Sequence, residues 1–456
     1  MSFLQDDKPG SCTIEFNQWR NSVYRKVAIR IIPCLFVGYL MAMFDRASIG
    51  FAKLEFLTQL GFSEAVYGFG AGLFFLGYMF FEVPSNIYLH KHGVRMTMLR
   101  IMVLWGAVTA LTLFISTPNQ FYIARLALGM AEAGFLPGIL LYITYWFPSD
   151  KKAQINALLL MAHPISGILG GLVAGGIMTS FAGTFGLAGW QVLFLYLGVP
   201  TMILGVFSYF YLTDRPEKAR WLNEREKKLL SDEITNIDDG AKHTGMMNFL
   251  KDGRIYVTAL GYFTVVSSVT SLSLWGPSII KEMGVSDISL IGPLTAIPYV
   301  VGAIAMYLVG RSSDFFLERR WHFIGCSVIA AIGFIGLWQF HSSFSIAMTF
   351  LCIAAFGIFG GFPLYLTIPA SFLPRSSAAG GISMVTTLGS LGGFVTPWVL
   401  GLVKNMTGSI YSGMVFAAGV SLLGGVLVCL AMRGARFHAP VNEPVKVPSA
   451  KKDRAY

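Results

Sequence analysis

The sequence predicts an all-α integral membrane protein with twelve transmembrane helices arranged as two six-helix halves. Three observations carry this prediction: the composition, the spacing of long apolar stretches and an internal duplication. Hydrophobic residues make up 54% of the 456 residues and charged residues only 13%, with a mean hydropathy of +0.62. A soluble domain carries roughly 25% charged residues, so the composition indicates a chain whose solvent is the lipid bilayer.

Each apolar stretch is long enough to cross the hydrocarbon core, which needs about 20 residues in a helix. In chain order, the predicted spans are 30–51, 66–89, 97–116, 119–146, 153–179, 188–212, 255–281, 288–309, 323–340, 344–368, 376–403 and 410–432.

The two halves are related by a repeat. Five Gly, Pro and Ala positions recur 226 residues later: Gly134, Pro137, Pro148, Ala153 and Gly167 correspond to Gly360, Pro363, Pro374, Ala379 and Gly393. A shared offset of this kind is the signature of internal duplication. We therefore predict an N-terminal tail (1–26), a first six-helix half (27–212), a polar cytoplasmic linker (213–254), a second half (255–432) and a C-terminal tail (433–456).

The distribution of positive charge predicts the orientation. Of 34 Lys and Arg, all but five fall in, or within four residues of, the two tails and the loops that follow even-numbered spans; the exceptions are Lys53, Lys281, Lys404, Arg46 and Arg125. Cytoplasmic loops carry the excess of positive charge. Both termini are therefore expected in the cytoplasm of a multi-pass inner membrane protein, and the net charge of +10 needs no nucleic-acid partner.

Other function classes find little support in the residues. The five cysteines form no paired CxxC spacing, and neither HExxH nor GxSxG appears, so we expect no enzyme activity, no metal and no cofactor. A membrane sensor is a remote alternative, because the stretch after Met432 is short and polar. The protein is expected to act as a monomer in the bilayer.

Four charges inside predicted spans are the candidate functional residues: Asp45, Arg46, Arg125 and Glu132. A charge at the centre of a spanning helix costs roughly 2.5–3.5 kcal/mol, so such residues pair, line a wet cavity or serve transport. Asp45 and Arg46 are adjacent and point about 100° apart, so at least one needs a partner on another span. Arg125 and Glu132 lie two turns apart, roughly 10 Å, on one helix face. Interhelical ion pairs that only hold the bundle together are the alternative interpretation.

Parallel six-helix halves resemble the major facilitator superfamily. Its loop motif is present as Gly310-Arg311-Ser312-Ser313-Asp314, followed by Arg319 and Arg320, and a degenerate first copy keeps Lys91, Gly93 and Arg95. The resemblance implies that Lys91, Arg95, Asp314, Arg319 and Arg320 form a cytoplasmic gate.

Further motifs resemble the anion:cation symporter family within that superfamily. They are Phe44-Asp45-Arg46, Glu82-Val83-Pro84-Ser85-Asn86, the Arg125 to Gly138 segment, Tyr145-Trp146-Phe147-Pro148 and Asp214-Arg215-Pro216-Glu217-Lys218. The resemblance covers about 30–432 and is nearest to bacterial permeases for tartrate, phthalate, hydroxyphenylacetate and sugar acids. It implies proton-coupled symport of an organic acid anion.

The roles implied are proton coupling by Asp45 and Glu132, and binding of the substrate carboxylate by Arg46 with Arg125 as a second contact. Further expected substrate contacts are Tyr78, His163, Trp275 and Thr386. His163 and Thr386 replace Gln and Asn of sugar-acid permeases, which favours a plainer or more aromatic acid; His163 and Glu82 also fit structural or gating roles. An uncoupled facilitator or an anion exchanger of the same fold remains the alternative function.

Overall fold

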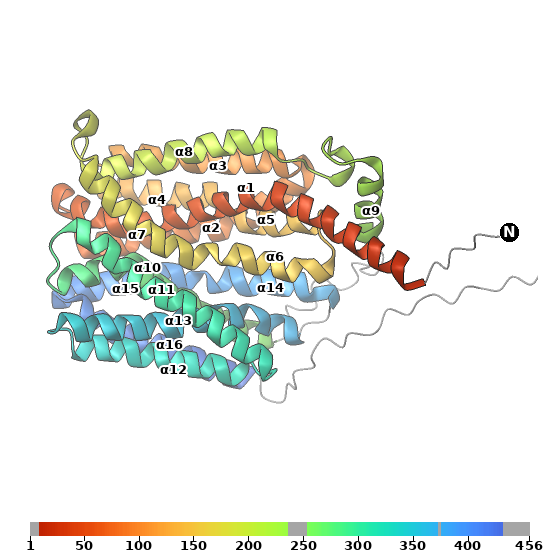
Figure 1. Ribbon diagram of the computed structural model, residues 1–456. Coiled ribbons are helices and arrows are strands. Elements are labelled where there is room, and N and C mark those ends of the chain that lie inside the picture. The colour runs from red at the N-terminus through yellow and green to blue at the C-terminus, as the bar shows by residue number, and fades with distance from the viewer. Residues whose placement is uncertain (1–8, 236–252, 373–374, 432–456) are drawn as a thin grey trace, which may run out of the picture.

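The computed structural model describes residues 9–235, 253–372 and 375–431, and within these ranges the chain is helical with no strand. The first half contains α1 (Pro9–Leu60), α2 (Glu64–His92), α3 (Val94–Leu111), α4 (Pro118–Glu132), α5 (Phe135–Thr144), α6 (Ser149–Leu160), α7 (Ala162–Ser180) and α8 (Gly189–Tyr211) (Figure 1). Helix α9 (Glu224–Thr235) follows in the linker. The second half contains α10 (Gly253–Glu282), α11 (Ile288–Phe315), α12 (Arg320–Gln339), α13 (Phe344–Phe372), α14 (Arg375–Gly389), α15 (Leu391–Thr407) and α16 (Ile410–Ala431).

Twelve helical stretches within the described ranges are long and apolar enough to span a membrane, which confirms the predicted number. Three of these spans consist of two consecutive helices: α4 with α5, α6 with α7, and α14 with α15. The repeat is visible in the helix starts, because α4 begins at Pro118 and α13 at Phe344, again 226 positions apart.

The break in the fourth span has a backbone cause. Gly134 adopts φ +85°, in the left-handed region that glycine tolerates, and the side chain of Ser85 packs against its Cα. Helix α4 therefore ends at Glu132 and α5 restarts at Phe135. Glu132, one of the four intramembrane charges, lies directly at this break.

Local sequence also fixes where spans begin. Ser63 accepts a hydrogen bond from the backbone N–H of Val66 and caps α2. At α4, Thr117 and Gln120 exchange side-chain to backbone hydrogen bonds of 3.4 and 3.3 Å. Such caps satisfy the free N–H groups of the first helical turn, so the helices start where the chain leaves the polar loops.

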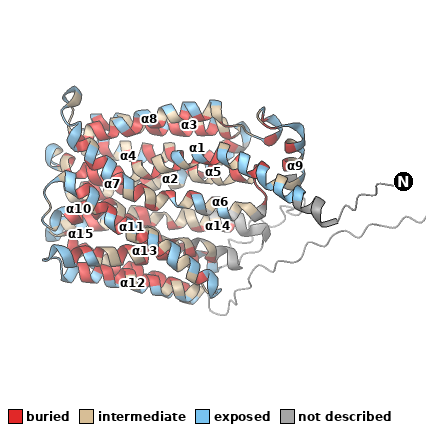
Figure 2. Ribbon diagram, viewed as in Figure 1, coloured by how far each residue is buried: buried red, intermediate tan, exposed pale blue. Residues whose placement is uncertain are grey.

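Large apolar side chains lie on the outside of the bundle, as a lipid-facing surface requires. Phe210 is 75% exposed, Phe114 69% and Ile203 64%. Figure 2 shows buried and exposed stripes alternating along the helices. An apolar surface of this extent would aggregate in water, which agrees with a multi-pass membrane protein.

We call one end of the bundle the outer end; it carries the connections 61–63, 181–188, 283–287 and 408–409, on the left of Figure 1. The inner end carries the start of α1 and helix α9 and, from the distribution of Lys and Arg, faces the cytoplasm. The halves touch through α2 with α15, α7 with α11, and α1 with α10.

These contacts between the halves are close at the outer end. A side chain on Gly68 of α2 would collide with the backbone of Pro397 in α15, and one on Gly171 of α7 with Gly292 in α11. One buried apolar cluster runs through both halves there and includes Phe51, Tyr67 and Trp275. The inner part of the first half has its own cluster around Trp105 and Trp146. The protein is therefore closed at its outer end.

The linker helix α9 is attached to the first half. Arg20 of α1 donates two hydrogen bonds to Glu233 at 2.7 and 2.8 Å, and Lys26 forms an ion pair with Glu226 at 2.9 Å. Burial raises the pKa of Glu226, but the backbone N–H of Asn223 and the Lys26 ammonium outweigh it and lower the pKa below its usual value. Helix α9 therefore sits against the first half as a charged cap on the cytoplasmic side.

Candidate functional site

Arg46 and Glu132 form an ion pair inside the first half. Arg46 comes from α1 and Glu132 from the end of α4. The Nε of Arg46 donates a hydrogen bond to Glu132 Oε1 at 2.8 Å, and a terminal nitrogen of Arg46 lies 2.7 Å from the same oxygen. The Arg46 side chain keeps 28% of its surface accessible, whereas Glu132 is fully buried. The accessible Arg46 guanidinium can therefore contact an incoming anion, and the buried Glu132 carboxylate lies on the far side of the guanidinium.

Asp45 points away from Arg46 and has its own partners on α3. Trp105 Nε1 donates to Asp45 at 3.0 Å, and the Thr109 hydroxyl lies 3.0 and 3.1 Å from its two oxygens. Asp45, Trp105 and Thr109 are all at most 2% exposed. As the adjacent positions require, the two charges find partners on two different helices.

Arg125 and Arg46 share an aromatic neighbour. The guanidinium carbons of Arg46 and Arg125 lie 5.1 and 5.2 Å from the centre of the Phe74 ring, and Arg46 also lies 5.0 Å from the Tyr78 ring. Such distances are favourable for cation–π attraction. Arg125 is buried, and the structure thus gathers Asp45, Arg46, Tyr78, Arg125 and Glu132 into one cluster.

Two polar atoms in this cluster have no hydrogen-bond partner among the described residues: Glu132 Oε2 and Arg125 Nε. Buried polar atoms are nearly always satisfied, and an exception calls for an explanation such as a function or a bound group. A carboxylate oxygen and a guanidinium nitrogen are, respectively, a proton acceptor and an anion contact.

His163 and Thr386 come from elsewhere in the bundle. His163 on α7 packs against two aromatic rings of the second half, Phe359 at 5.7 Å and Phe362 at 5.5 Å. Thr386 lies half-buried on α14, next to Thr387, whose hydroxyl donates to Glu82 Oε2 at 3.1 Å. Both residues therefore lie where the second half approaches the first.

Trp275 lies apart from the charged cluster. It is fully buried at the outer end, where the Lys53 ammonium sits 3.6 Å from its ring and Tyr67 packs against it at 5.3 Å. In this conformation Trp275 belongs to the contact between the halves, and a substrate contact by Trp275 stays a prediction.

Four of the five expected gate residues, Arg95, Asp314, Arg319 and Arg320, have contacts within their own halves. Lys91 is exposed at the inner end of α2, and Arg95 donates to the Tyr209 carbonyl at 2.7 Å. In the second half, Arg319 pairs with Asp314 at 3.1 Å, and Arg320 donates to Cys429 Sγ at 3.1 Å. A gate that joins the two sets stays a prediction for another conformation.

Sequence reasoning missed Trp105 and Thr109. The available signal was their spacing: they lie four residues apart in the third predicted span and so share one helix face. A Trp and a Thr on one face of an apolar helix are donors for a buried carboxylate, but nothing in the sequence indicates that this face meets Asp45.

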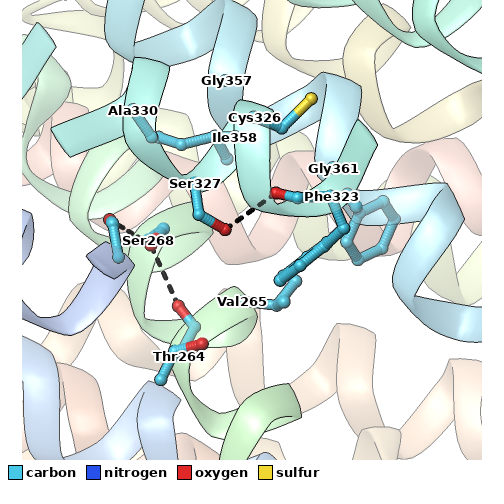
Figure 3. A pocket seen from close by; sticks show the side chains of 12 residues that line it. Thr264, Val265, Ser268, Phe323, Cys326, Ser327, Ala330, Gly357, Ile358 and Gly361 are labelled. Carbon is cyan, nitrogen blue, oxygen red and sulfur yellow. Dashed lines mark hydrogen bonds between the residues drawn. The ribbon is translucent and has the colours of Figure 1, made fainter. Parts of the chain in front are cut away.

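A small pocket lies inside the second half, between α10, α12, α13 and α16 (Figure 3). Its polar lining consists of hydroxyls and a thiol, and no charged side chain lines it. The hydroxyls of Ser268 and Ser421 bond to each other at 3.0 Å, and Ser327 donates to the Phe323 carbonyl. These hydroxyls are satisfied by each other or by a backbone carbonyl, and the lining offers no positive group to hold an anion. Within the described ranges there is also no cluster of His, Cys, Asp and Glu that could hold a metal ion.

Comparison with known sequences points to transporters. The chain is 41% identical over 420 residues to a putative tartrate transporter of Agrobacterium vitis, covering 91% of this chain and 93% of the relative. It is 38% identical to the putative metabolite transport protein NicT of Pseudomonas putida, covering 89% and 94%. A quinolone resistance transporter of Acinetobacter baumannii is 37% identical, covering 90% and 94%.

Solved structures show the same fold. A D-xylose–proton symporter superposes with a TM-score of 0.71 at 17% identity, covering 90% of this chain and 98% of that one. A bacterial homologue of the lysosomal transporter Spinster, inward-facing and occupied, also gives 0.71 at 16% identity, covering 91% and 99%. The family model of the Major Facilitator Superfamily matches residues 35–397. The chain therefore belongs to the major facilitator superfamily and is a multi-pass inner membrane transporter, not an enzyme.

Proposed function

We propose that this transporter takes up a small organic acid anion together with protons, by alternating access. The observation that carries the proposal is the geometry of the Arg46 and Glu132 pair. The accessible Arg46 is held by one oxygen of a fully buried carboxylate whose other oxygen has no hydrogen-bond partner among the described residues. Charge in a membrane is retained for function more often than for stability.

The pair supplies a mechanism for coupling. A substrate carboxylate can bind the Arg46 guanidinium in the two-pronged geometry that arginine prefers, and it then competes with Glu132. Without its positive partner, Glu132 is a buried carboxylate in a low-dielectric site, and such a group is stabilised by taking up a proton. Anion binding and protonation of Glu132 thus favour each other, which is the linkage that symport needs.

Asp45 is the second proposed proton carrier. It is buried, and the charge of Arg125 acts on it from within the cluster. Its hydrogen bonds to Trp105 and Thr109 hold the carboxylate on the side facing α3. In the proposal Arg125 balances whichever of Asp45 and Glu132 is ionised, and it supplies a second anion contact.

The surroundings of Arg46 set the proposed substrate class. Phe74 and Tyr78 face the guanidinium, and His163 lies among aromatic rings of the second half. Together with Thr386 these side chains suit a carboxylate with a compact hydroxylated or aromatic body. The relative named as a putative tartrate transporter makes tartrate the first acid to test.

Gating completes the cycle. We place Lys91 and Arg95 of the first half opposite Asp314 of the second when the inner ends approach, with Arg319 and Arg320 beside it, since Asp314 carries the charge opposite to that of Lys91 and Arg95. Both halves belong to one chain and carry one central site, so a monomer is the proposed functional unit.

The alternative is an uncoupled facilitator or anion exchanger, which would use the arginines without the acids. Purified protein in liposomes separates the two. We expect labelled tartrate, galactonate, phthalate or hydroxyphenylacetate to accumulate only with an inward proton gradient, and Arg46→Ala to abolish accumulation. Exchange that ignores the gradient would support the alternative.

A further inference from the structure

We infer that Lys53, Glu64, Glu282 and Lys404, here called the outer network, form an outer gate that opens by dividing into two electrically neutral ion pairs. The inference concerns the conformational cycle and does not depend on the identity of the substrate or on proton coupling. Three of the four residues lie in the outermost turns of spanning helices, and Lys53 lies two turns from the end of α1.

The four side chains form a chain of contacts. Lys53 Nζ lies 2.7 Å from Glu64 Oε2, Lys404 Nζ lies 2.6 Å from Glu64 Oε1, and Lys404 Nζ lies 2.7 Å from Glu282 Oε1. Exposed fractions run from 3% for Lys53 to 26% for Glu282. These ion pairs are thus largely shielded from water. Because of this shielding they are stronger than ion pairs on the surface.

The network crosses the interface between the halves at one ion pair. Lys53 and Glu64 belong to the first half, on α1 and α2, whereas Glu282 and Lys404 belong to the second, on α10 and α15. Only the Glu64 to Lys404 contact, among the three ion pairs above, joins the halves. The Lys53 ammonium also crosses, because it lies 3.6 Å from the centre of the Trp275 ring.

Separation of the outer ends would leave each charge with a partner. Lys53 keeps Glu64 in the first half, and Lys404 keeps Glu282 in the second, so each half retains one positive and one negative group. A buried charge that loses its only partner is strongly destabilising, and this arrangement keeps a partner for each charge. The ion pairs can therefore hold the outer end closed without preventing it from opening.

Hydrogen bonds to backbone carbonyls in the same layer also join the halves. Tyr67 donates to the Leu274 carbonyl at 2.9 Å, and Lys281 donates to the Leu54 carbonyl at 3.2 Å. They lie beside the outer network, so the crossing contacts form one layer around Trp275. Within this layer Glu64 links the two halves, because it forms an ion pair with a lysine from each half.

The test measures the distance between the outer ends. Spin labels would be placed at Ala182→Cys in the first half and Ser342→Cys in the second, two exposed loop positions at the outer end, in a variant lacking the five native cysteines. Double electron–electron resonance in nanodiscs would report short, closed distances and long, open ones. We expect Glu64→Gln to raise the open-to-closed ratio roughly tenfold, the effect of losing about 1.4 kcal/mol of charged contacts.

The matched control is Asp287→Asn. Asp287 also lies at the outer end, but it accepts a hydrogen bond from the backbone of Ser289 in its own half, at 2.8 Å, so loss of its charge should leave the ratio unchanged. Lys404→Gln is the second test variant and should shift the open-to-closed ratio in the same direction. It allows the inference to be tested even if Glu64→Gln does not fold. An unchanged distance distribution in the folded test variants, or an equal shift in Asp287→Asn, would overturn the inference.

Discussion

Glu132 presents only one of its two carboxylate oxygens to Arg46: both arginine nitrogens contact Oε1, at 2.8 and 2.7 Å. The second oxygen is buried and has no hydrogen-bond partner among the residues that the structure describes. A pair held only for stability would satisfy both oxygens, since an unsatisfied buried acceptor costs about 1–3 kcal/mol. This asymmetry is what links an anion site to a proton site in the proposed cycle.

Replacing Arg46 by lysine should impair substrate binding although the charge is kept. Lysine is a point charge and cannot offer the planar fork that binds a carboxylate with two hydrogen bonds. We expect the KM for the transported acid to rise at least about tenfold, as the loss of one charged hydrogen bond implies. Initial uptake rates into proteoliposomes measure it. Arg100→Lys, outside the cluster on α3 and half-buried, is the control and should leave KM unchanged.

Removing the hydrogen bonds to Asp45 should weaken the fold of the first half. In Thr109→Val the Asp45 carboxylate loses one of its two donors, at a cost of about 1–3 kcal/mol. We expect a lower midpoint of thermal unfolding in detergent. The comparison is Thr112→Val; the Thr112 hydroxyl donates to the carbonyl of Val108, one turn earlier at the end of α3. Equal midpoints for the two variants would contradict the positioning role of Thr109.

Enlarging Gly171 should block closure of the outer end. Its Cα faces the backbone of Gly292 in the other half without room for a side chain, and small residues let spanning helices approach this closely. Gly171→Val should therefore remain folded by size-exclusion chromatography but lose most of its uptake. Gly176→Val, on the same helix at a position where an added Cβ would meet nothing within 4 Å, should transport normally. Normal uptake by Gly171→Val would show that this close contact is dispensable.

Acid should loosen the linker helix. Because the folded-state pKa of Glu226 is lowered, its contribution to the attachment of α9 is present above the ordinary value of 4.5 and is lost as the pH falls through the lowered pKa. Trp221, stacked on Trp146 at 5.6 Å, reports the attachment through its fluorescence. We expect an acid transition in the wild type that is weaker in Glu226→Gln. An acid transition of the same size in the wild type and in Glu226→Gln would show that a titratable group other than Glu226 causes it.

Much of the fold was predictable because bilayer thickness dictates helix length and charge distribution dictates orientation. The number of spans and the all-α class are confirmed. The break at Gly134 was not predicted, because the stretch 119–146 was interpreted as one continuous span and the positive φ shows only in the backbone. A break inside a span depends on the residue that packs beside it, here Ser85. Which residue packs there cannot be predicted from the sequence of the span itself.

The site was predictable as a set of residue types more than as a set of contacts. The cost of intramembrane charge selects Asp45, Arg46, Arg125 and Glu132 from the sequence. That Arg46 pairs with Glu132 while Asp45 pairs with Trp105 depends on which helices neighbour α1. Trp275 is a second example: its contact with Lys53 joins the two halves and was not indicated by the sequence, while its expected contact with the substrate stays a prediction.

The central claim is that Glu132 couples the anion at Arg46 to a proton, and Glu132→Gln tests it most directly. Two assays would be run on the same proteoliposomes: accumulation of labelled acid driven by a proton gradient, and exchange of labelled for unlabelled acid at equal pH. We predict that Glu132→Gln loses accumulation but retains exchange, because the neutral side chain mimics the protonated state. Gradient-driven accumulation at the wild-type level in Glu132→Gln would contradict the account.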